Sequence, residues 1–216
     1  MNLSRRPRVL IADDHLMVAE ALKSLLAPEF DLVGVVEDGR KLVEAAGTLR
    51  PDVIVADITM PHLNGIDALV QLRQRGDRVP VVFLTMHRDA SFARRALDAG
   101  ASGFVLKHSA PAELLLAIRA ALEGKTYLTP QLAGEVLEAM KQGPQQTGGT
   151  LGSLTPRQRE VLQLAAEGQS AKQIASTLGI SPRTVEFHKY QMMESLGLRT
   201  NAELVHFAIK HGLVER

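Results

Sequence analysis

Five short apolar runs divide the N-terminal half of this 216-residue chain into repeating units. The runs are Val9–Ala12, Leu32–Val36, Val53–Ala56, Val81–Leu84 and Gly103–Leu106. They do not alternate with polar residues, and the segments between them have the length and apolar periodicity of amphipathic helices. A strand that is apolar on both faces is typical of a parallel sheet covered by helices on both sides. The pattern therefore predicts an α/β fold with a five-stranded parallel sheet.

A second domain is expected after a stretch without aliphatic side chains. Residues 143–150 include three glycines and no aliphatic residue, a composition typical of a flexible linker. We therefore expect an α/β domain at residues 1–126, a connecting helix and linker at residues 127–153, and a small all-α domain at residues 154–216.

Composition limits the cellular compartment in which the protein is expected and the kinds of metal or covalent site that it can form. The chain has no cysteine, which excludes disulfides and thiolate metal sites and is compatible with a reducing cytosol. The first apolar run is cut by Asp13, so we expect no signal peptide, and no run approaches the roughly 20 residues of a membrane span. We expect a cytoplasmic protein with no membrane partner.

Side chains that could form one site follow the first, third, fourth and fifth apolar runs directly. Asp13 and Asp14 follow the first run, Asp57 the third, Thr85 the fourth and Lys107 the fifth. A single acid after a strand most often caps a turn. Parallel strands, however, end at the same edge of the sheet, where open α/β folds place their ligand sites. The five coincidences together favour a functional site at that edge.

The acids at this edge predict a cation. Three carboxylates that converge repel one another unless a positive charge neutralises them. A cluster of oxygen ligands suits Mg²⁺, which keeps several waters and prefers a few carboxylates together with a phosphate. The predicted cofactor is therefore Mg²⁺.

Residues 8 to about 125 resemble the receiver domain of bacterial two-component response regulators. The resemblance rests on the paired acids of IADDH, the segment DITMPHLNG, the threonine of LTM and the lysine of GFVLK. It implies a flavodoxin-like fold in which Asp57 accepts a phosphoryl group from a phosphohistidine of a sensor histidine kinase. Asp13 and Asp14 would help to hold Mg²⁺, together with Asp57 and the backbone carbonyl of Thr59.

The same resemblance assigns roles to three further residues. Lys107 would pair with the phosphoryl charge, and the Thr85 hydroxyl would donate to a phosphoryl oxygen. Phe104 stands where the family has an aromatic residue that fills the space left by the threonine, although an aromatic in a strand is as often plain core. The chain would catalyse only phosphoryl transfer to Asp57 and hydrolysis from it, so we do not expect an enzyme with a separate substrate.

Four helix starts follow in quick succession after the linker. Thr155, Ser170 and Thr200 each stand three residues before a Gln or Glu, as in a capping box, and Ser181 precedes a proline. The segment LGIS joins the second and third helices by a tight turn, which is helix-turn-helix geometry. Helical spacing on the third helix directs one set of residues to the core and turns Phe187 and Tyr190 outward. The core set is Val185, His188, Met192 and Leu196.

Residues from Leu154 to about Leu213 resemble the LuxR-type DNA-binding domain of NarL/FixJ response regulators. The segment SPRTVEFHKYQMMESLGLRTNAEL is especially close to the FixJ-like branch. The resemblance implies that the third helix enters the major groove of promoter DNA. It also implies a homodimer on phosphorylation, with Leu204 and Ala208 of the fourth helix at the interface, although both could equally be core. The expected DNA-binding residues are Lys172, Arg183, Thr184, Glu186, Phe187, Lys189 and Tyr190.

Three other protein classes fit the sequence less well. A phosphohydrolase of the haloacid dehalogenase type carries its nucleophile in a DxDxT run on the first strand, where this chain has DDHLM. The segment EGKT has Arg119 where a nucleotide-binding loop requires its first glycine. A regulator that acts only through protein contacts would need a damaged DNA-binding domain. We therefore expect a phosphorylation-dependent, DNA-binding transcriptional regulator.

Overall fold

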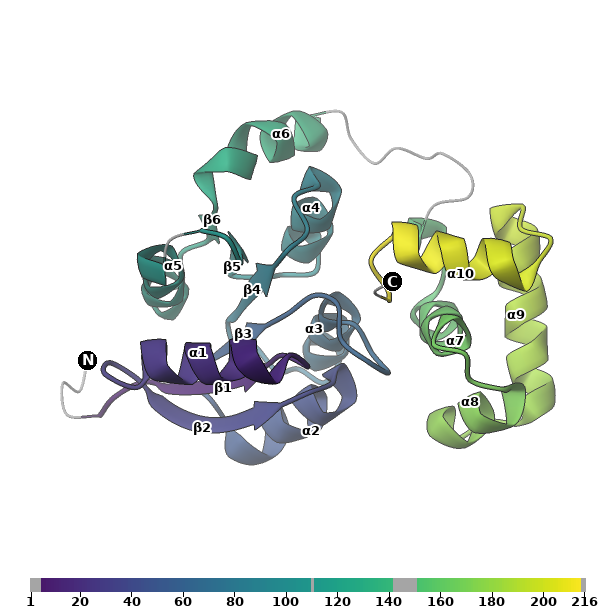
Figure 1. Cartoon of the computed structure of the whole chain (residues 1–216), viewed down its shortest axis with the longest axis horizontal. Helices are drawn as coiled ribbons and strands as arrows, with labels where there is room; N and C mark the ends of the chain where they lie inside the picture. The colour runs from purple at the N-terminus through teal and green to yellow at the C-terminus, as the bar shows by residue number, and fades with distance from the viewer. Residues whose placement is uncertain (1–4, 110, 142–150, 215–216) are drawn as a thin grey trace. The chain divides into compact units, whose positions relative to one another are not determined.

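The computed structural model describes residues 5–109, 111–141 and 151–214. They separate into two compact units, an N-terminal α/β unit and a C-terminal helical unit, and each is described by itself (Figure 1). No helix in these ranges has both the length and the apolar character needed to cross a lipid bilayer.

The N-terminal unit is built on a six-stranded parallel sheet with the order β2-β1-β3-β4-β5-β6. Each predicted apolar run is a strand, and the parallel direction is confirmed. The sixth strand was not predicted, because two residues are too few to show a period. The strands are β1 (Arg8–Ala12), β2 (Asp31–Val36), β3 (Val53–Ala56), β4 (Val81–Thr85), β5 (Gly103–Leu106) and β6 (Tyr127–Leu128).

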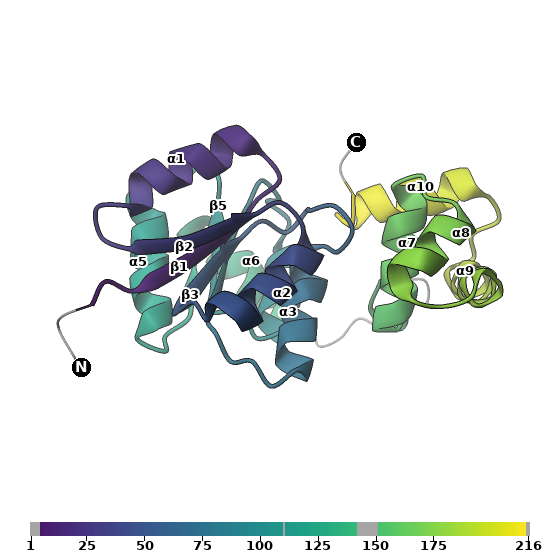
Figure 2. The ribbon, with the colours of Figure 1, turned by 90° about the horizontal axis from the view of Figure 1, so that it is seen from below.

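Helices cover both faces of the sheet, which explains why its central strands are apolar throughout. Val9 and Ile11 of β1 face a core shared with α1 and α5, whereas Leu10 is buried outside that cluster. Figure 2 shows α2 and α3 on the side of the sheet opposite α1. The helices are α1 (Leu16–Leu26), α2 (Gly39–Leu49), α3 (Gly65–Gln74), α4 (Ala90–Asp98) and α5 (Pro111–Leu122).

One more helix, α6 (Pro130–Lys141), follows β6 and packs against α4 (Figure 1). Its residues Leu132 and Val136 are buried. Tyr127 and Leu128 pair with Gly103 and Phe104 of β5, so the chain after α5 returns to the edge of the sheet before α6 begins.

The C-terminal unit contains α7 (Pro156–Ala166), α8 (Ala171–Leu178), α9 (Pro182–Leu196) and α10 (Asn201–Lys210). The capping boxes predicted at Thr155 and Ser170 are both present, and Ser181 caps α9 before its N1 proline. Thr200 caps α10 by accepting from the Glu203 N–H, but the Glu203 carboxylate accepts from the Arg199 N–H. The polar residues before each apolar pattern therefore fix where all four helices begin.

Two contacts fix the turn between α8 and α9. Gly179 has a φ of 65° and ends α8 in the left-handed conformation that glycine adopts without strain. Arg157 of α7 donates from Nη2 to the Leu178 carbonyl at 2.6 Å and from Nη1 to Glu160 at 3.0 Å. These contacts hold the pair in the helix-turn-helix arrangement that the sequence predicts.

Candidate functional site

Charged side chains from three strand ends meet at the carboxyl edge of the sheet. Asp13 follows β1, Asp57 follows β3 and Lys107 follows β5. The Lys107 Nζ lies 2.5 Å from Asp57 Oδ2 and 2.8 Å from Asp13 Oδ2. The exposed fraction of the side chain is 10% for Lys107, 5% for Asp57 and 2% for Asp13. The edge therefore holds a buried cluster in which one lysine faces two carboxylates.

Asp57 is held by the main chain on both sides. Its N–H donates to the Ala12 carbonyl at 2.8 Å, and its Oδ1 accepts from the Ile58 N–H at 2.6 Å. The Gly65 N–H at the start of α3 donates to the Ile58 carbonyl at 2.7 Å. A Cβ on Gly65 would lie 2.1 Å from the Asp57 carbonyl oxygen, so only glycine permits this close approach. The carboxylate is thus fixed in direction by a strand, a loop and a helix.

Burial and charge act in opposite directions on Asp57. Burial raises the pKa of this carboxyl to about 6, against the opposing effect of the Lys107 charge and hydrogen bond. Burial alone would lower the pKa of Lys107, but Asp57 and Asp13 outweigh it and leave that pKa raised. Lys107 is therefore a permanent cation at neutral pH, and the site still has an excess of acids.

Four neighbouring residues could hold a metal ion. One ligand atom from each of Asp13, Asp14, His15 and Asp57 lies within 4.8 Å of the others. The carboxylate oxygens fit a hard divalent cation. His15 was not predicted; its Nδ1 lies 3.0 Å from Asp14 Oδ1, and its backbone N–H donates to Asp13 Oδ1 at 2.9 Å. Its position directly after the acid pair was the available signal.

Thr85 and Thr59 are linked through His87, which sequence reasoning also missed. The buried Thr85 accepts on Oγ1 from the His87 N–H at 3.2 Å. The His87 Nε2 lies 2.8 Å from Thr59 Oγ1, and its ring stacks on Phe92 of α4 with centroids 4.3 Å apart. The loops after β3 and β4 are therefore joined to each other and to α4. Proximity to Thr85 in the chain was the one hint of this role.

Phe104 is fully buried in the sheet. It stands opposite Phe83 in the register of β4 and β5. The structure therefore places it in the core, and a movement in response to Thr85 stays a prediction.

An exposed stripe runs along α9 in the C-terminal unit. Val185 and Met192 are buried in the core of the unit, as predicted, and His188 and Leu196 are half-buried. Phe187 and Tyr190 are 56% and 67% exposed, one helical turn apart. Arg183 is exposed on the same stripe, four residues before Phe187. An aromatic pair beside a cation is thus presented to the outside.

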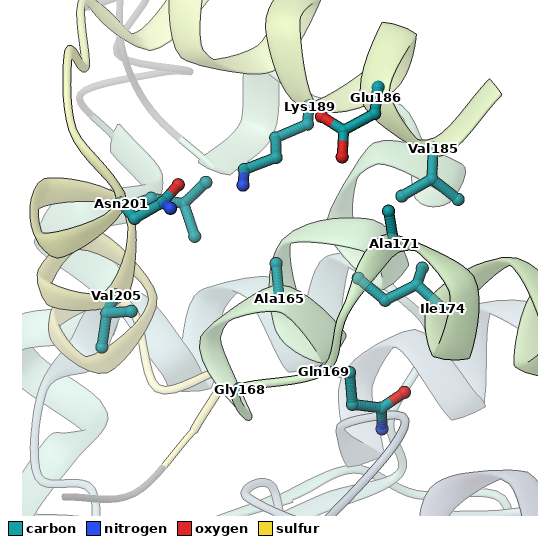
Figure 3. A pocket seen from close by; sticks show the side chains of 11 residues that line it. Ala165, Gly168, Gln169, Ala171, Ile174, Val185, Glu186, Lys189, Asn201 and Val205 are labelled. Atoms are coloured by element: carbon teal, nitrogen blue, oxygen red, sulfur yellow. The ribbon is translucent and has the colours of Figure 1, made fainter. Parts of the chain in front are cut away.

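Of the remaining residues predicted to contact DNA, Thr184, Glu186 and Lys189 lie on α9 and Lys172 lies on α8. An open pocket of about 220 Å³ is lined by residues of α7, α8, α9 and α10. Figure 3 shows Glu186 and Lys189 directed toward it. Lys189 is half-buried there, so it lies beside the stripe and not on it. Thr184 is tied to the helix start, since its N–H donates to Ser181 Oγ at 3.1 Å. Lys172 is exposed on α8.

The structure gives Leu204 and Ala208 the core position that the sequence left open beside a dimer interface. Their side chains belong to the core of the C-terminal unit, and the two residues are 1% and 0% exposed. Both face inward because α10 packs on α7, which leaves them no surface for a second copy. The exposed residues of α10 are Asn201, Ala202, Glu203, His206 and Lys210.

Two family models match the chain. Residues 9–119 match the response regulator receiver domain, and residues 152–208 match the luxR family of bacterial regulatory proteins.

Individual relatives match along nearly the whole length. The transcriptional regulatory protein MctR of Rhizobium johnstonii is 32% identical, with 99% of each chain covered. The response regulator UvrY of Escherichia coli K12 is 30% identical over 95% of this chain and 94% of its own. Among solved structures, RcsB of Salmonella enterica serovar Typhimurium, bound to the promoter P1flhDC with the phosphomimetic BeF3-, has a TM-score of 0.64. It is 26% identical, with 94% of this chain and 98% of that chain covered.

Proposed function

This chain belongs to the two-component response regulators that carry a LuxR-type DNA-binding domain, and on that premise we propose that phosphorylation of Asp57 controls promoter binding through α9. A receiver domain implies a histidine kinase as the phosphoryl donor. The observation that carries the proposal is the buried cluster of Asp57, Lys107 and Asp13 beside Asp14. A cluster with this charge excess suits a reaction that brings a phosphoryl group to a fixed carboxylate.

Positioning does most of the chemical work at Asp57. An oxygen of its carboxylate attacks phosphorus in line, and the P–N bond to the donor histidine breaks. The electron pair of that bond leaves with the imidazole nitrogen, which takes up a proton. The Ile58 N–H holds Oδ1 in place during the attack, so the carboxylate keeps the direction of approach.

Lys107 and Thr85 stabilise the negative charge of the incoming phosphoryl group. Lys107 moves its Nζ from the Asp57 carboxylate to a phosphoryl oxygen, as a charge-assisted hydrogen bond. Thr85 Oγ1 already accepts from the His87 N–H, which leaves its own proton free to donate to the phosphoryl group.

The acid cluster fits Mg²⁺ by the hardness of its oxygen ligands. Asp13, Asp14, Asp57 and the Thr59 carbonyl would hold the ion, which would neutralise charge on the phosphoryl oxygens and orient them. The carboxylates of this chain keep the cluster compact enough to share one ion.

A kinase must bring its phosphohistidine within reach of Asp57, and a groove beside Lys107 suits such a partner. The groove has a volume of about 500 Å³, and Met17, Met86 and Pro111 are among the residues that line it with Lys107. Met17 and Met86 are largely exposed. Exposed methionines beside a reactive group favour contact with a protein partner, because their flexible side chains adapt to its surface.

The stripe on α9 suits the major groove of DNA. Arg183 and Lys172 can reach phosphates, whereas Phe187 and Tyr190 can contact base edges such as the thymine methyl. Glu186 can accept from cytosine N4. An aromatic pair left exposed on a small helical unit is more stable when a partner covers it.

We also propose that phosphorylation favours a homodimer. One RcsB structure contains two dimers bound to two parallel DNAs, and that arrangement supports the same mode here. The contact must use surface other than Leu204 and Ala208, since both are buried.

Labelling tests the central residue. Incubation with Mg²⁺ and radioactive acetyl phosphate, or with a phosphorylated kinase, should label the wild type and not Asp57→Asn. The surface variant Asp98→Asn is a matched control, because that carboxylate is 62% exposed and lies on α4 away from the cluster. Label that persists in Asp57→Asn would refute the assignment.

A further inference from the structure

Thr129 lies at the junction of β6 and α6 and is fully buried. Its N–H donates to the Phe104 carbonyl at 3.0 Å, and its Oγ1 accepts from the Leu106 N–H at 3.3 Å. The residue register of β6 with β5 ends at Leu128, and Thr129 is the next residue. The side chain of Thr129 therefore replaces a backbone carbonyl and continues the pairing to the last residue of β5.

The bond from Thr129 ends one residue from the reactive lysine. Leu106 is bonded to Lys107, whose Nζ pairs with Asp57 and Asp13. The Lys107 N–H donates to the Thr85 carbonyl at 2.8 Å. The end of β5 is thus held on one side by Thr85 and on the other by Thr129.

Thr129 also holds the start of α6. The Leu132 N–H donates to the Thr129 carbonyl at 3.0 Å, and Leu132 and Val136 are buried where α6 lies along α4. The contact between α6 and α4 also connects α6 to the phosphoryl site. Phe92 of α4 stacks on His87, and the His87 N–H donates to Thr85. In the sequence α6 is the last described helix before the C-terminal unit.

We propose that Thr129 is a positioning residue that couples the phosphoryl site to α6. Its hydroxyl holds the end of β5 in the position in which Lys107 pairs with Asp57, and the shift of Lys107 toward a phosphoryl group breaks this bond and loosens α6. At 3.3 Å the bond is longer than the usual N–H···O distance of about 2.9 to 3.0 Å, so a small displacement is enough. The inference rests on the proposed role of Asp57.

Coupling of this kind works in both directions. The phosphorylated arrangement loosens α6, so removing the hydroxyl should both loosen α6 and favour that arrangement. Thr129→Val keeps the shape of the side chain and removes the hydroxyl, whereas Thr129→Ser keeps the hydroxyl. If the hydrogen bond carries the coupling, Thr129→Ser should behave as the wild type does and Thr129→Val should not. A role of packing alone does not predict this difference.

Hydrogen exchange in the full chain measures the effect on residues 130–141, with Mg²⁺ and beryllofluoride as the phosphoryl mimic. In the wild type, the mimic should raise the exchange rate of these residues roughly fivefold, which is the change that the loss of one ordinary hydrogen bond produces. Thr129→Val should exchange faster from the start, respond little to the mimic and bind it several-fold more tightly. Thr129→Ser should behave as the wild type does. Exchange in α2, with urea unfolding of each variant, checks that the fold is intact.

Two results would overturn the inference, and they are distinguishable. Fluorine NMR shows whether beryllofluoride is bound. A bound signal in all three proteins, with the same exchange response in residues 130–141, would overturn the coupling alone. No bound signal in the wild type would overturn the proposed role of Asp57 and the coupling with it.

Discussion

At the scale of single residues, Asp57 combines a reactive role with a cost to stability. Its folded pKa is raised to about 6 from 3.8, so the folded protein binds a proton more tightly than the unfolded chain does. The free energy of unfolding therefore falls as the pH rises from about 4 to about 6. A buried carboxylate that destabilises the metal-free protein at neutral pH is expected where function has selected the residue.

Replacing this carboxylate should stabilise the metal-free protein. With EDTA present, we expect Asp57→Asn to raise the free energy of unfolding at pH 7 by about 1 to 3 kcal/mol, because each tenfold change in proton affinity corresponds to about 1.4 kcal/mol. The gain should shrink near pH 4, where the wild-type carboxyl is also neutral. Urea unfolding at both pH values measures it. A variant less stable than the wild type at pH 7 would contradict the assigned pKa direction.

Gly65 should matter as much as the charged residues for the phosphorylation of Asp57. Gly65→Ala places a Cβ 2.1 Å from the Asp57 carbonyl oxygen, so we expect a loss of about 1 to 3 kcal/mol in stability. A displacement of Asp57 by about 1 Å should also slow its phosphorylation by acetyl phosphate roughly a hundredfold. Gly47→Ala in α2 is the matched control, since its Cβ would meet nothing within 4 Å. Equal phosphorylation rates in the two variants would show that the approach of α3 does not position Asp57.

At the scale of elements, different residues of α9 should determine the affinity for DNA and the preference for a DNA sequence. Arg183→Ala should weaken binding about equally on all DNA sequences and reduce the salt slope by about 1, because it removes one phosphate contact. Tyr190→Ala should instead change the preferred base at one or two positions, at about 1 to 3 kcal/mol per contact, and leave the salt slope nearly constant. Lys189→Ala should have the smaller effect on the slope, since Lys189 turns toward the pocket (Figure 3).

Selection from a random DNA pool, followed by binding at several salt concentrations, distinguishes these effects. Phe187→Ala serves as a second aromatic variant on the same stripe. If the wild type and both aromatic variants selected the same motif, the exposed face of α9 would not be the face that reads bases.

The groove beside Lys107 gives a test of contact with the kinase. Met17 is 88% exposed, so Met17→Glu should leave the fold intact. We expect it to slow phosphoryl transfer from the kinase at least tenfold, because a charge replaces an apolar contact, while the reaction with acetyl phosphate stays unchanged. The second reaction needs no docking and is the internal control. Equal loss in both reactions would place the effect at Asp57 and not at a docking surface.

The accuracy of the sequence-based predictions differs between local and tertiary features. The strands and the helix starts in the C-terminal unit were predictable, because apolar runs and capping residues act within a few positions. His15, His87 and Thr129 were not assigned to the site, because their roles depend on contacts between segments far apart in the chain or on loop geometry. The period of α10 identified an apolar face, but it could not tell whether that face meets a second copy or the core of its own unit. The sequence therefore left Leu204 and Ala208 open between a dimer interface and the core.

At the scale of the whole molecule, a reaction at one sheet edge has to change the behaviour of a separate DNA-binding unit. Typical coupling free energies of about 1 to 3 kcal/mol change an affinity by about 5- to 150-fold. A change of that size requires only modest differences in contacts between two states of the protein. The state of Asp57 should therefore alter DNA affinity measurably even though Asp57 lies outside the C-terminal unit.

The most direct test is the affinity of the full-length chain for a DNA sequence selected from a random pool, measured with and without Mg²⁺ and beryllofluoride. We predict that beryllofluoride raises the affinity of the wild type at least fivefold. The affinity of Asp57→Asn should not change, because the variant lacks the carboxylate that binds the mimic. Equal wild-type affinity in both conditions, with fluorine NMR showing the mimic bound, would contradict control of DNA binding by phosphorylation of Asp57.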